Sequence, residues 1–329
     1  MTSIPFNSFW HHTTHRALVP SSVSHVPEKA DLVIVGAGIF GLCTAIEVAR
    51  CAPHLGIVVL EKTYPGAGST GRSGGIIYVN GDYLPGSESN FRAFSAWLQR
   101  FGLNRLMTFG PSKSPNGEFE YPAHLMNPQV LADQLSIVAQ SLGVHLVTGS
   151  PVRAITPDVD RIRLKTHRND LLTKIVVLAA GTHFAPELFP DSPLSVEIEH
   201  CVAVEVAPSS DLPWNFAKVT NPTTDDFVWG RTLSSRMFLF GNRAGDCSRG
   251  TMLECTLQSL AKNLPYVRVT RPITHWIGLI DRFHQSNKWQ TFELEEGGCR
   301  IYFAGGFNGQ GLLGGFTAAL DVTRRILDT

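Results

Sequence analysis

The stretch Asp31-Leu-Val-Ile-Val-Gly-Ala-Gly-Ile-Phe-Gly41 decides the fold. It joins a short apolar run, rich in β-branched residues, to residues 40–50, whose apolar side chains recur at helical spacing. A second apolar run, Ile57-Val-Val-Leu-Glu61, follows at once. Because strand, helix and strand succeed one another directly, we expect the two strands to be parallel, with a right-handed crossover between them.

Three glycines of this stretch form a GxGxxG pattern between the strand and the helix. Gly36 lets the chain turn sharply, Gly38 allows the backbone to touch a pyrophosphate, and Gly41 permits close packing of helix on strand. The helix N-terminus offers N–H groups and partial positive charge to an anion. The pattern therefore predicts a dinucleotide site, with Ile39 and Phe40 as further contacts.

An acidic residue ends the second strand, as dinucleotide sites of this kind require. Glu61 lies 20 residues beyond Gly41, where a carboxylate accepts hydrogen bonds from both ribose hydroxyls. The same carboxylate repels a 2′-phosphate, which disfavours NADP. Lys62, the next residue, is included among the predicted cofactor contacts.

Composition limits the classes of partner. The chain has 329 residues, of which 43% are hydrophobic, and its 28 basic residues balance 28 acidic ones. Such a chain can bury a large core and carries no net field that would attract nucleic acid or an anionic membrane. With no signal-peptide pattern at the N-terminus and no apolar run of spanning length, we expect a cytoplasmic enzyme acting on a small molecule.

Cysteine and histidine spacing favours neither a metal site nor a disulfide framework. Residues 1–29 are expected to form an N-terminal arm on the surface, in which three histidines are interpreted as part of a solvated tail rather than as metal ligands. These histidines are His11, His12 and His15, and the six cysteines are Cys43, Cys51, Cys201, Cys247, Cys255 and Cys299.

Two further glycine-rich segments indicate a cofactor longer than a nicotinamide dinucleotide. Residues 66–75 follow the first unit closely, and a dehydrogenase that uses only NAD has no evident need for them. Residues 304–315 again join a strand to a helix, so a second helix N-terminus can face a partly negative group. The N1 and O2 edge of a reduced flavin is such a group.

At these segments the sequence resembles the D-amino-acid oxidase and glycine or sarcosine oxidase family of FAD-dependent oxidoreductases. The resemblance implies non-covalent FAD, because Cys299 does not match the family's attachment position. It covers residues 8–80 and 296–329 well and is weak between them. The implied contacts beyond the first unit are Gly71, Arg72, Ser73, Gly74, Gly75, Val152, Ala180, Gly181, Gly306, Phe307, Asn308, Gly309, Gln310 and Gly311.

The expected fold is an α/β Rossmann-like FAD-binding domain interleaved with a smaller substrate domain of mixed or antiparallel β-sheet. Residues 30–80, 128–195 and 296–329 are assigned to the former, and residues 81–127 and 196–295 to the latter. Further elements are expected from local patterns. They are a helix at 130–142, a strand at 144–147, a β pair of 162–164 with 174–178, strands at 202–206, 237–240 and 300–304, and a helix at 317–327.

The resemblance implies that FAD takes a hydride from the carbon next to the nitrogen of a small amine or amino acid, giving an imine, with O2 or another acceptor reoxidising the cofactor. No catalytic residue is assigned. Arginine binds carboxylates in bidentate fashion, although solvated charge is an alternative at each position. The pocket candidates are Arg72, Arg243, His275 and Trp276, with Arg231 and Arg236 as further carboxylate clamps.

Departures from the family pattern keep alternatives open. The region from 75 to 128 is short, residues 275–282 lack the customary Asp-x-x-Pro, and no lysine occupies 238–243, where sarcosine oxidases lead us to expect an oxygen-activating lysine. A flavin dehydrogenase, or a biosynthetic oxidase with another acceptor, is one alternative. A non-catalytic FAD-binding subunit that needs a protein partner is another, and a plain NAD-dependent dehydrogenase is the last.

Overall fold

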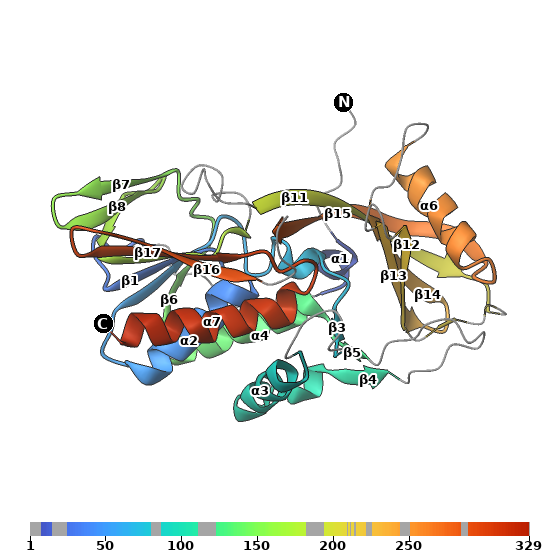
Figure 1. The fold of residues 1–329 in the computed structure, drawn as a ribbon, viewed down its shortest axis with the longest axis horizontal. Coiled ribbons are helices and arrows are strands. Elements are labelled where there is room, and N and C mark those ends of the chain that lie inside the picture. The colour runs from blue at the N-terminus through green and yellow to red at the C-terminus, as the bar shows by residue number, and fades with distance from the viewer. Residues whose placement is uncertain are drawn as a thin grey trace.

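The computed structural model places two sheets along the long axis of the molecule (Figure 1), a mainly parallel one and an antiparallel one. Among its described helices, none is both long and apolar enough to cross a membrane. The described residues are 8–14, 25–79, 87–110, 123–181, 194–208, 210, 212–213, 215–221, 226–243, 251–283 and 289–328. His15 and Cys247, discussed above, lie outside them.

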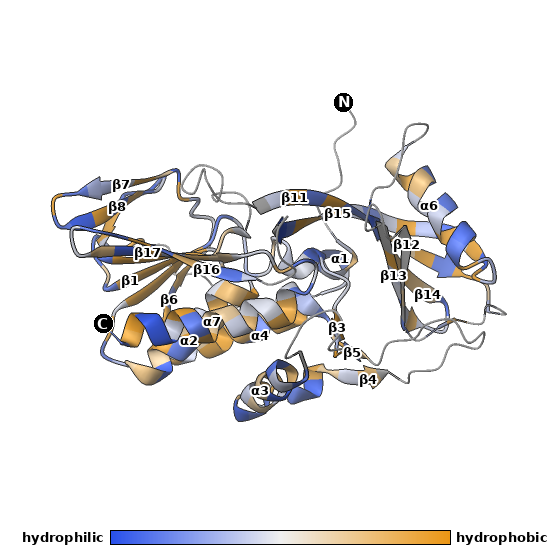
Figure 2. Ribbon diagram, viewed as in Figure 1, coloured by the Kyte–Doolittle hydropathy of each residue, from blue (hydrophilic) through white to orange (hydrophobic). Residues whose placement is uncertain are grey.

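The six-stranded sheet has the order β16-β17-β10-β1-β2-β6, and only β16 runs antiparallel to its neighbour. Its central strands are short and almost wholly hydrophobic (Figure 2), as expected where both faces are covered. The predicted strand-helix-strand unit is confirmed. The strands are β1 (Leu32–Val35), β2 (Ile57–Leu60), β6 (His145–Val147), β10 (Ile175–Leu178), β16 (Gln290–Glu296) and β17 (Cys299–Gly305).

Three helices cover one face of this sheet: α2 (Ile39–Cys51), α4 (Pro128–Ser141) and α7 (Gly311–Leu327). The third begins six residues earlier than expected, so the predicted glycine loop is partly helical. Its early start follows from packing, because a Cβ on Gly315 would lie 2.8 Å from Ile39 Cγ2. Glycine at that position lets α7 lie directly against the start of α2.

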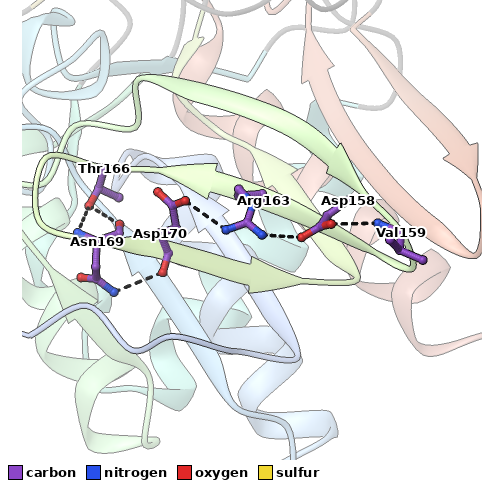
Figure 3. Close-up of polar contacts among 6 residues, drawn as sticks. All are labelled: Asp158, Val159, Arg163, Thr166, Asn169 and Asp170. Carbon is purple, nitrogen blue, oxygen red and sulfur yellow. Dashed lines mark hydrogen bonds and ion pairs between the residues drawn. The ribbon is translucent and has the colours of Figure 1, made fainter.

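The opposite face carries a three-stranded antiparallel sheet of β7 (Ala154–Asp158), β8 (Arg161–Lys165) and β9 (Asp170–Thr173). The expected pairing of 162–164 with 174–178 is wrong, because β8 pairs with β7 and β9 whereas β10 joins the parallel sheet. Local pattern identified both strands but not their partners. Figure 3 shows Arg163 linking the strands through Asp158 (2.6 Å) and Asp170 (3.1 Å).

The five-stranded sheet has the order β12-β13-β14-β11-β15 and is antiparallel throughout. Helix α6 (Met252–Asn263) packs on one face, over Val202 and Val204. The other face carries Cys201, Ala203, Trp229 and Trp276, which form an apolar cluster with the N-terminal segment. The strands are β11 (Leu194–Val206), β12 (Asn215–Asn221), β13 (Asp226–Ser234), β14 (Met237–Arg243) and β15 (Val269–Phe283).

Smaller elements complete the chain. A sheet of order β3-β5-β4 lies beside α3 (Ser87–Arg100), and short helical turns occur at α1 (Phe9–Thr13), η2 (Thr70–Arg72) and η3 (Asn104–Leu106). Cys255 in α6 is disulfide-bonded, a pairing that the cysteine spacing did not predict. The strands of the small sheet are β3 (Ile76–Tyr78), β4 (Thr108–Gly110) and β5 (Ala123–Leu125).

Strand pairing moves two of the proposed domain boundaries. β16 pairs along its whole length with β17, so the boundary at residue 296 belongs before residue 290. β3 pairs with β5, which places residues 76–78 with the small sheet rather than with the first unit. With these changes the discontinuous two-domain division remains our proposal.

Replacing Phe316 by alanine tests the packing that holds α7 in place. Its buried ring lies 5.0 Å from the Phe94 ring and 5.3 Å from the Trp97 ring, measured between centroids. We expect Phe316→Ala to lower the free energy of unfolding by about 3–5 kcal/mol, measured by denaturant unfolding, because it leaves a cavity. Phe109→Ala is the control, since that side chain is 61% exposed. Equal losses in both variants would contradict this account.

Candidate FAD and substrate site

The first glycine segment makes a turn in which the backbone touches itself. Gly36 has φ +109°, and a Cβ there would lie 2.5 Å from the carbonyl oxygen of Ala179. A Cβ on Gly41 would lie 2.1 Å from the carbonyl oxygen of Gly36. The turn between β1 and α2 therefore closes against the end of β10, which brings it next to Ala180, another predicted contact.

Glu61 holds the first glycine segment to the end of β2. Its carboxylate accepts hydrogen bonds from the backbone N–H of Ala37 at 2.8 Å and of Thr63 at 2.9 Å. Burial raises the pKa of Glu61, and these two backbone donors oppose the rise. The expected contact with ribose hydroxyls remains a prediction, as does any contact by Lys62, whose side chain is exposed.

The second glycine segment lies against the first. Thr70 Oγ1 accepts a hydrogen bond from the backbone N–H of Ile39 at 3.0 Å, at the N-terminus of α2. A Cβ on Gly71 would lie 2.4 Å from the Gly66 carbonyl oxygen, so this turn too is closed by backbone contact. Two segments that are separated along the chain by residues 42–65 thus form one surface.

The N-terminal segment covers the second glycine segment. Ser8 Oγ donates to the carbonyl oxygen of Gly71, and Trp10 Nε1 donates to that of Ser73 at 2.8 Å. His11 is 6% exposed and its Nδ1 lies 3.0 Å from the Ser8 backbone nitrogen, so the solvated tail expected here is wrong for His11, although His12 is exposed. The aromatic residues of the segment pack on the antiparallel sheet, which draws it out of solvent.

The third glycine segment is anchored by Asp281 at the end of β15. The Asp281 carboxylate accepts from the backbone N–H of Gly306 at 2.8 Å, and its carbonyl oxygen accepts from the N–H of Asn308 at 3.1 Å. Burial raises the pKa of Asp281, whereas the backbone donors lower it. Asn308 adopts φ +50°, and none of the residues that the structure describes makes a hydrogen bond to its buried amide nitrogen and oxygen.

Strand β15 connects the second and third segments. Trp276 Nε1 donates to the Arg72 carbonyl oxygen at 2.9 Å, and Ser69 Oγ donates to the Leu279 carbonyl oxygen at 3.2 Å. Asp281, on the same strand, holds the third segment. All three glycine segments therefore meet where the parallel-sheet part faces β15.

The arginine candidates separate into three environments. Arg231 is 8% exposed and donates to the carbonyl oxygens of Gly75 and Met126, both at 2.9 Å, while its guanidinium lies 5.2 Å from the Trp10 ring. Burial lowers the pKa of Arg231 to about 10. From the sequence, Arg231 was expected to be either a solvated charge or a substrate clamp. In the structure its side chain instead holds two loops together. Arg236 is exposed, as the alternative reading expected.

Arg243 is placed beside the third glycine segment. A Cβ on Gly309 would lie 3.7 Å from Arg243 Nη2, and Arg243 Nε lies 3.6 Å from a carboxylate oxygen of Glu197. Arg282 Nε approaches the same oxygen at 3.1 Å. The arginine side chains are only 11% and 18% exposed, so this cluster of two cations and one anion lies at the meeting point of loop and sheet.

Of the remaining pocket candidates, Trp276 and Arg72 lie together, whereas His275 lies apart from them. Trp276 is fully buried and faces Arg72, whose own pKa is lowered by burial. His275 pairs with Val202 and shares the face covered by α6, so the sequence pairing of His275 with Trp276 as pocket residues is wrong. Neighbouring strand residues point to opposite faces, which explains the separation. Val152 is buried on the far face of the parallel sheet, and its adenine contact stays a prediction.

Glu199 and Trp229 are functional candidates that no pattern in the sequence indicated. Glu199, on β11, is buried, and its Oε1 accepts the indole N–H of Trp229 at 2.7 Å. The Trp229 ring packs against Gly74, where a Cβ would lie 2.6 Å from it. Along β11 the apolar Val196 and Ile198 are exposed while Glu199 points inward, so the alternating pattern predicts the opposite orientation.

The assembled surface fits an extended dinucleotide. Among the described residues, none has an atom within 4 Å of a Cβ added at Gly181 or Gly311, and only Thr70 Oγ1 comes near one added at Gly38, at 3.1 Å. The amide of Asn308, to which none of these residues bonds, supplies a donor and an acceptor in the third segment. Backbone can thus come close to phosphates at α2 and to a ring edge at the third segment.

A sequence model described as DAO, FAD dependent oxidoreductase, matches residues 31–107 and 97–325. The chain belongs to this family of FAD-dependent oxidoreductases. The predicted family, enzyme class, α/β fold and FAD cofactor are thereby confirmed, and the NAD-only alternative is excluded. No curated protein matches the chain.

Solved structures resemble this oxidoreductase over most of its length. Glycine oxidase from Geobacillus kaustophilus has a TM-score of 0.66 at 17% identity, covering 91% of this chain and 95% of that one. NikD, an unusual amino acid oxidase essential for nikkomycin biosynthesis, has a TM-score of 0.66 at 19% identity, covering 90% of this chain and 94% of that one. L-proline dehydrogenase from P. horikoshii has a TM-score of 0.67 at 17% identity, covering 92% of this chain and 94% of that one. At these identities the likeness establishes the fold.

Trp10→Phe tests whether the N-terminal segment supports the FAD site. The phenyl ring keeps most of the packing but leaves the Ser73 carbonyl without its donor, which costs about 1–3 kcal/mol when the group is buried. We expect weaker FAD binding, measured by the fluorescence of FAD released on dilution. His12→Ala is the control in the same segment. Wild-type FAD affinity in Trp10→Phe would show that the segment does not support the site.

Proposed function

We propose that this FAD-dependent oxidoreductase oxidises the carbon–nitrogen bond of a small amine or amino acid to an imine. The observation that carries the proposal is the position of Arg243, beside the third glycine segment on the sheet face that meets all three segments. With Glu197 and Arg282 it forms a cluster of net positive charge, which suits a substrate carboxylate. The family likeness to glycine oxidase, NikD and L-proline dehydrogenase supports the same chemistry.

In this proposal the protein binds, orients and shields the substrate, and FAD, when bound, would supply the hydride acceptor. The predicted contacts Gly36, Gly38 and Gly41 would hold the pyrophosphate, and Asn308 would bond a polar ring edge. Trp229 and Trp276 form a buried apolar wall beside the second segment, which keeps water out. Cys299 lies at the start of β17, the end remote from Gly306, which supports non-covalent FAD.

A dehydrogenase, or a biosynthetic oxidase that uses another acceptor, is the second candidate. Residues 238–243 of β14 contain no lysine, so the oxygen-activating residue that the resemblance led us to look for is missing from this strand. Reoxidation by O2, a cytoplasmic location and a possible protein partner of a non-catalytic FAD subunit stay predictions.

Anaerobic bleaching of the bound flavin tests the proposed reaction. We expect at least one of glycine, N-methylglycine, L-proline, D-alanine and L-phenylalanine to bleach the visible absorption of the holoenzyme, because hydride transfer removes it. L-lactate is the matched control, since it has the carboxylate and the Cα hydrogen but no nitrogen. Bleaching by lactate and by none of the amines would refute the proposal. Peroxide formation in air would then separate oxidase from dehydrogenase.

Arg243→Gln tests the proposed carboxylate clamp. Loss of a charge-assisted hydrogen bond worth about 1.5–3 kcal/mol should raise the amino-acid concentration that half-saturates bleaching by about 10- to 100-fold. Arg236→Gln, at an exposed site of the neighbouring turn, should leave it unchanged. FAD content is measured in both variants. A wild-type half-saturating concentration in Arg243→Gln would remove Arg243 from the binding site.

A further inference from the structure

Glu199 lies on the face of the antiparallel sheet that meets the glycine segments. Its Cα partners across the sheet are Arg243 on β14 and Gly278 on β15. Gly278 has no side chain, and a Cβ added there would be in ordinary van der Waals contact, 3.7 Å from Glu199 Oε2 and 4.0 Å from the Arg72 carbonyl oxygen. The carboxyl group therefore faces the second glycine segment across Gly278.

The orientation of this carboxyl group is fixed from one side only. Trp229 Nε1 holds Oε1 at 2.7 Å, and the indole is itself clamped between Gly74 and Gly241, where added Cβ atoms would lie 2.6 and 2.3 Å from the ring. No hydrogen bond to Oε2 comes from the residues that the structure describes. One oxygen is thus positioned by the protein and the other is turned toward Gly278.

The electrostatic surroundings keep Glu199 able to exchange a proton near neutral pH. Burial raises the pKa of Glu199 to about 7, and the charge of Glu197 adds to the rise, while the Trp229 hydrogen bond opposes it. Cys201 on the same strand is buried, and its own pKa is raised mainly by burial. The cations on this side are Arg231 on β13, Arg243 on β14, Arg282 on β15 and Arg72 in η2.

We propose that Glu199 accepts the proton of the substrate ammonium group when the substrate binds, an assignment that rests on the proposed function. The N–H bond of the ammonium breaks, its electron pair stays on nitrogen, and the proton forms an O–H bond at Glu199 Oε2. The neutral amine could then supply its lone pair as the Cα hydride leaves with both bond electrons, for which bound FAD would be the acceptor. The products are an iminium ion, reduced cofactor and neutral Glu199.

The physical reason is that an ammonium group cannot support hydride loss from its carbon, since its nitrogen has no lone pair. An aliphatic amine keeps its proton in water up to a pH of about 10. Inside a water-poor site both ions of a carboxylate and ammonium pair are penalised, so the neutral pair becomes accessible. A buried carboxyl group meets this need when one of its oxygens is bonded by none of the described residues, as is the case for Glu199.

Glu199→Gln tests the assignment, because glutamine keeps an acceptor for the Trp229 N–H but cannot take up a proton. With glycine, N-methylglycine and L-proline as probes, we expect anaerobic bleaching at pH 8 to slow by about 10²- to 10⁴-fold. Raising the pH, which deprotonates free amine, should restore part of the rate in the variant. Glu205→Gln, on the same strand and paired with Arg271, is the matched control and should bleach at the wild-type rate.

A second readout needs no substrate and no FAD. A carboxyl group whose pKa is raised in the folded state contributes stability that is present at low pH and is lost as pH rises through the folded value. Between about pH 5 and pH 8 the unfolding midpoint of wild type should therefore fall more than that of Glu199→Gln. Wild-type bleaching and an unchanged pH profile in Glu199→Gln would overturn the assignment, whereas failure of every amine to bleach wild type would overturn the proposed function with it.

Discussion

The structure depends on close contacts between backbone segments at the first glycine turn, where glycine leaves no side chain between them. Gly41 packs on the Gly36 carbonyl, and Gly36 on the Ala179 carbonyl, at distances that no Cβ could occupy. This contact fixes the start of α2 against the ends of β1 and β10. Close packing recurs at Gly71, which lies against the Gly66 carbonyl within the second segment, and at Gly315, which lies against Ile39 of the first unit.

Strand β15 gives the candidate site its second wall. It bonds the second segment through Trp276 and the third through Asp281, although these segments are separated by more than 200 residues of chain. Because β15 also pairs with β11 over most of its length, residues of the two strands that point to the same face of the sheet lie side by side. Glu197, Glu199 and Arg282 occur together for this reason.

Buried charges in this region serve different purposes. Arg231 is surrounded by carbonyl oxygens and by the Trp10 ring, so its charge is used to hold loops. Asp281 is satisfied by backbone N–H groups of the loop that it anchors. Glu199 differs, since Trp229 bonds one of its oxygens and the other faces Gly278, which has no side chain. The partners of each group distinguish a structural charge from one able to react.

The sequence by itself determined the parallel unit, the three glycine segments and the cofactor, because glycine spacing and apolar runs act over short distances along the chain. It could not determine which strands pair, as the misplaced partner of 162–164 shows, since pairing depends on contacts distant in sequence. Nor could it place Ser8, His11 or Glu199 at the site. Their burial arises only when the N-terminal segment and β11 close over the second glycine segment, so tertiary structure alone decided it.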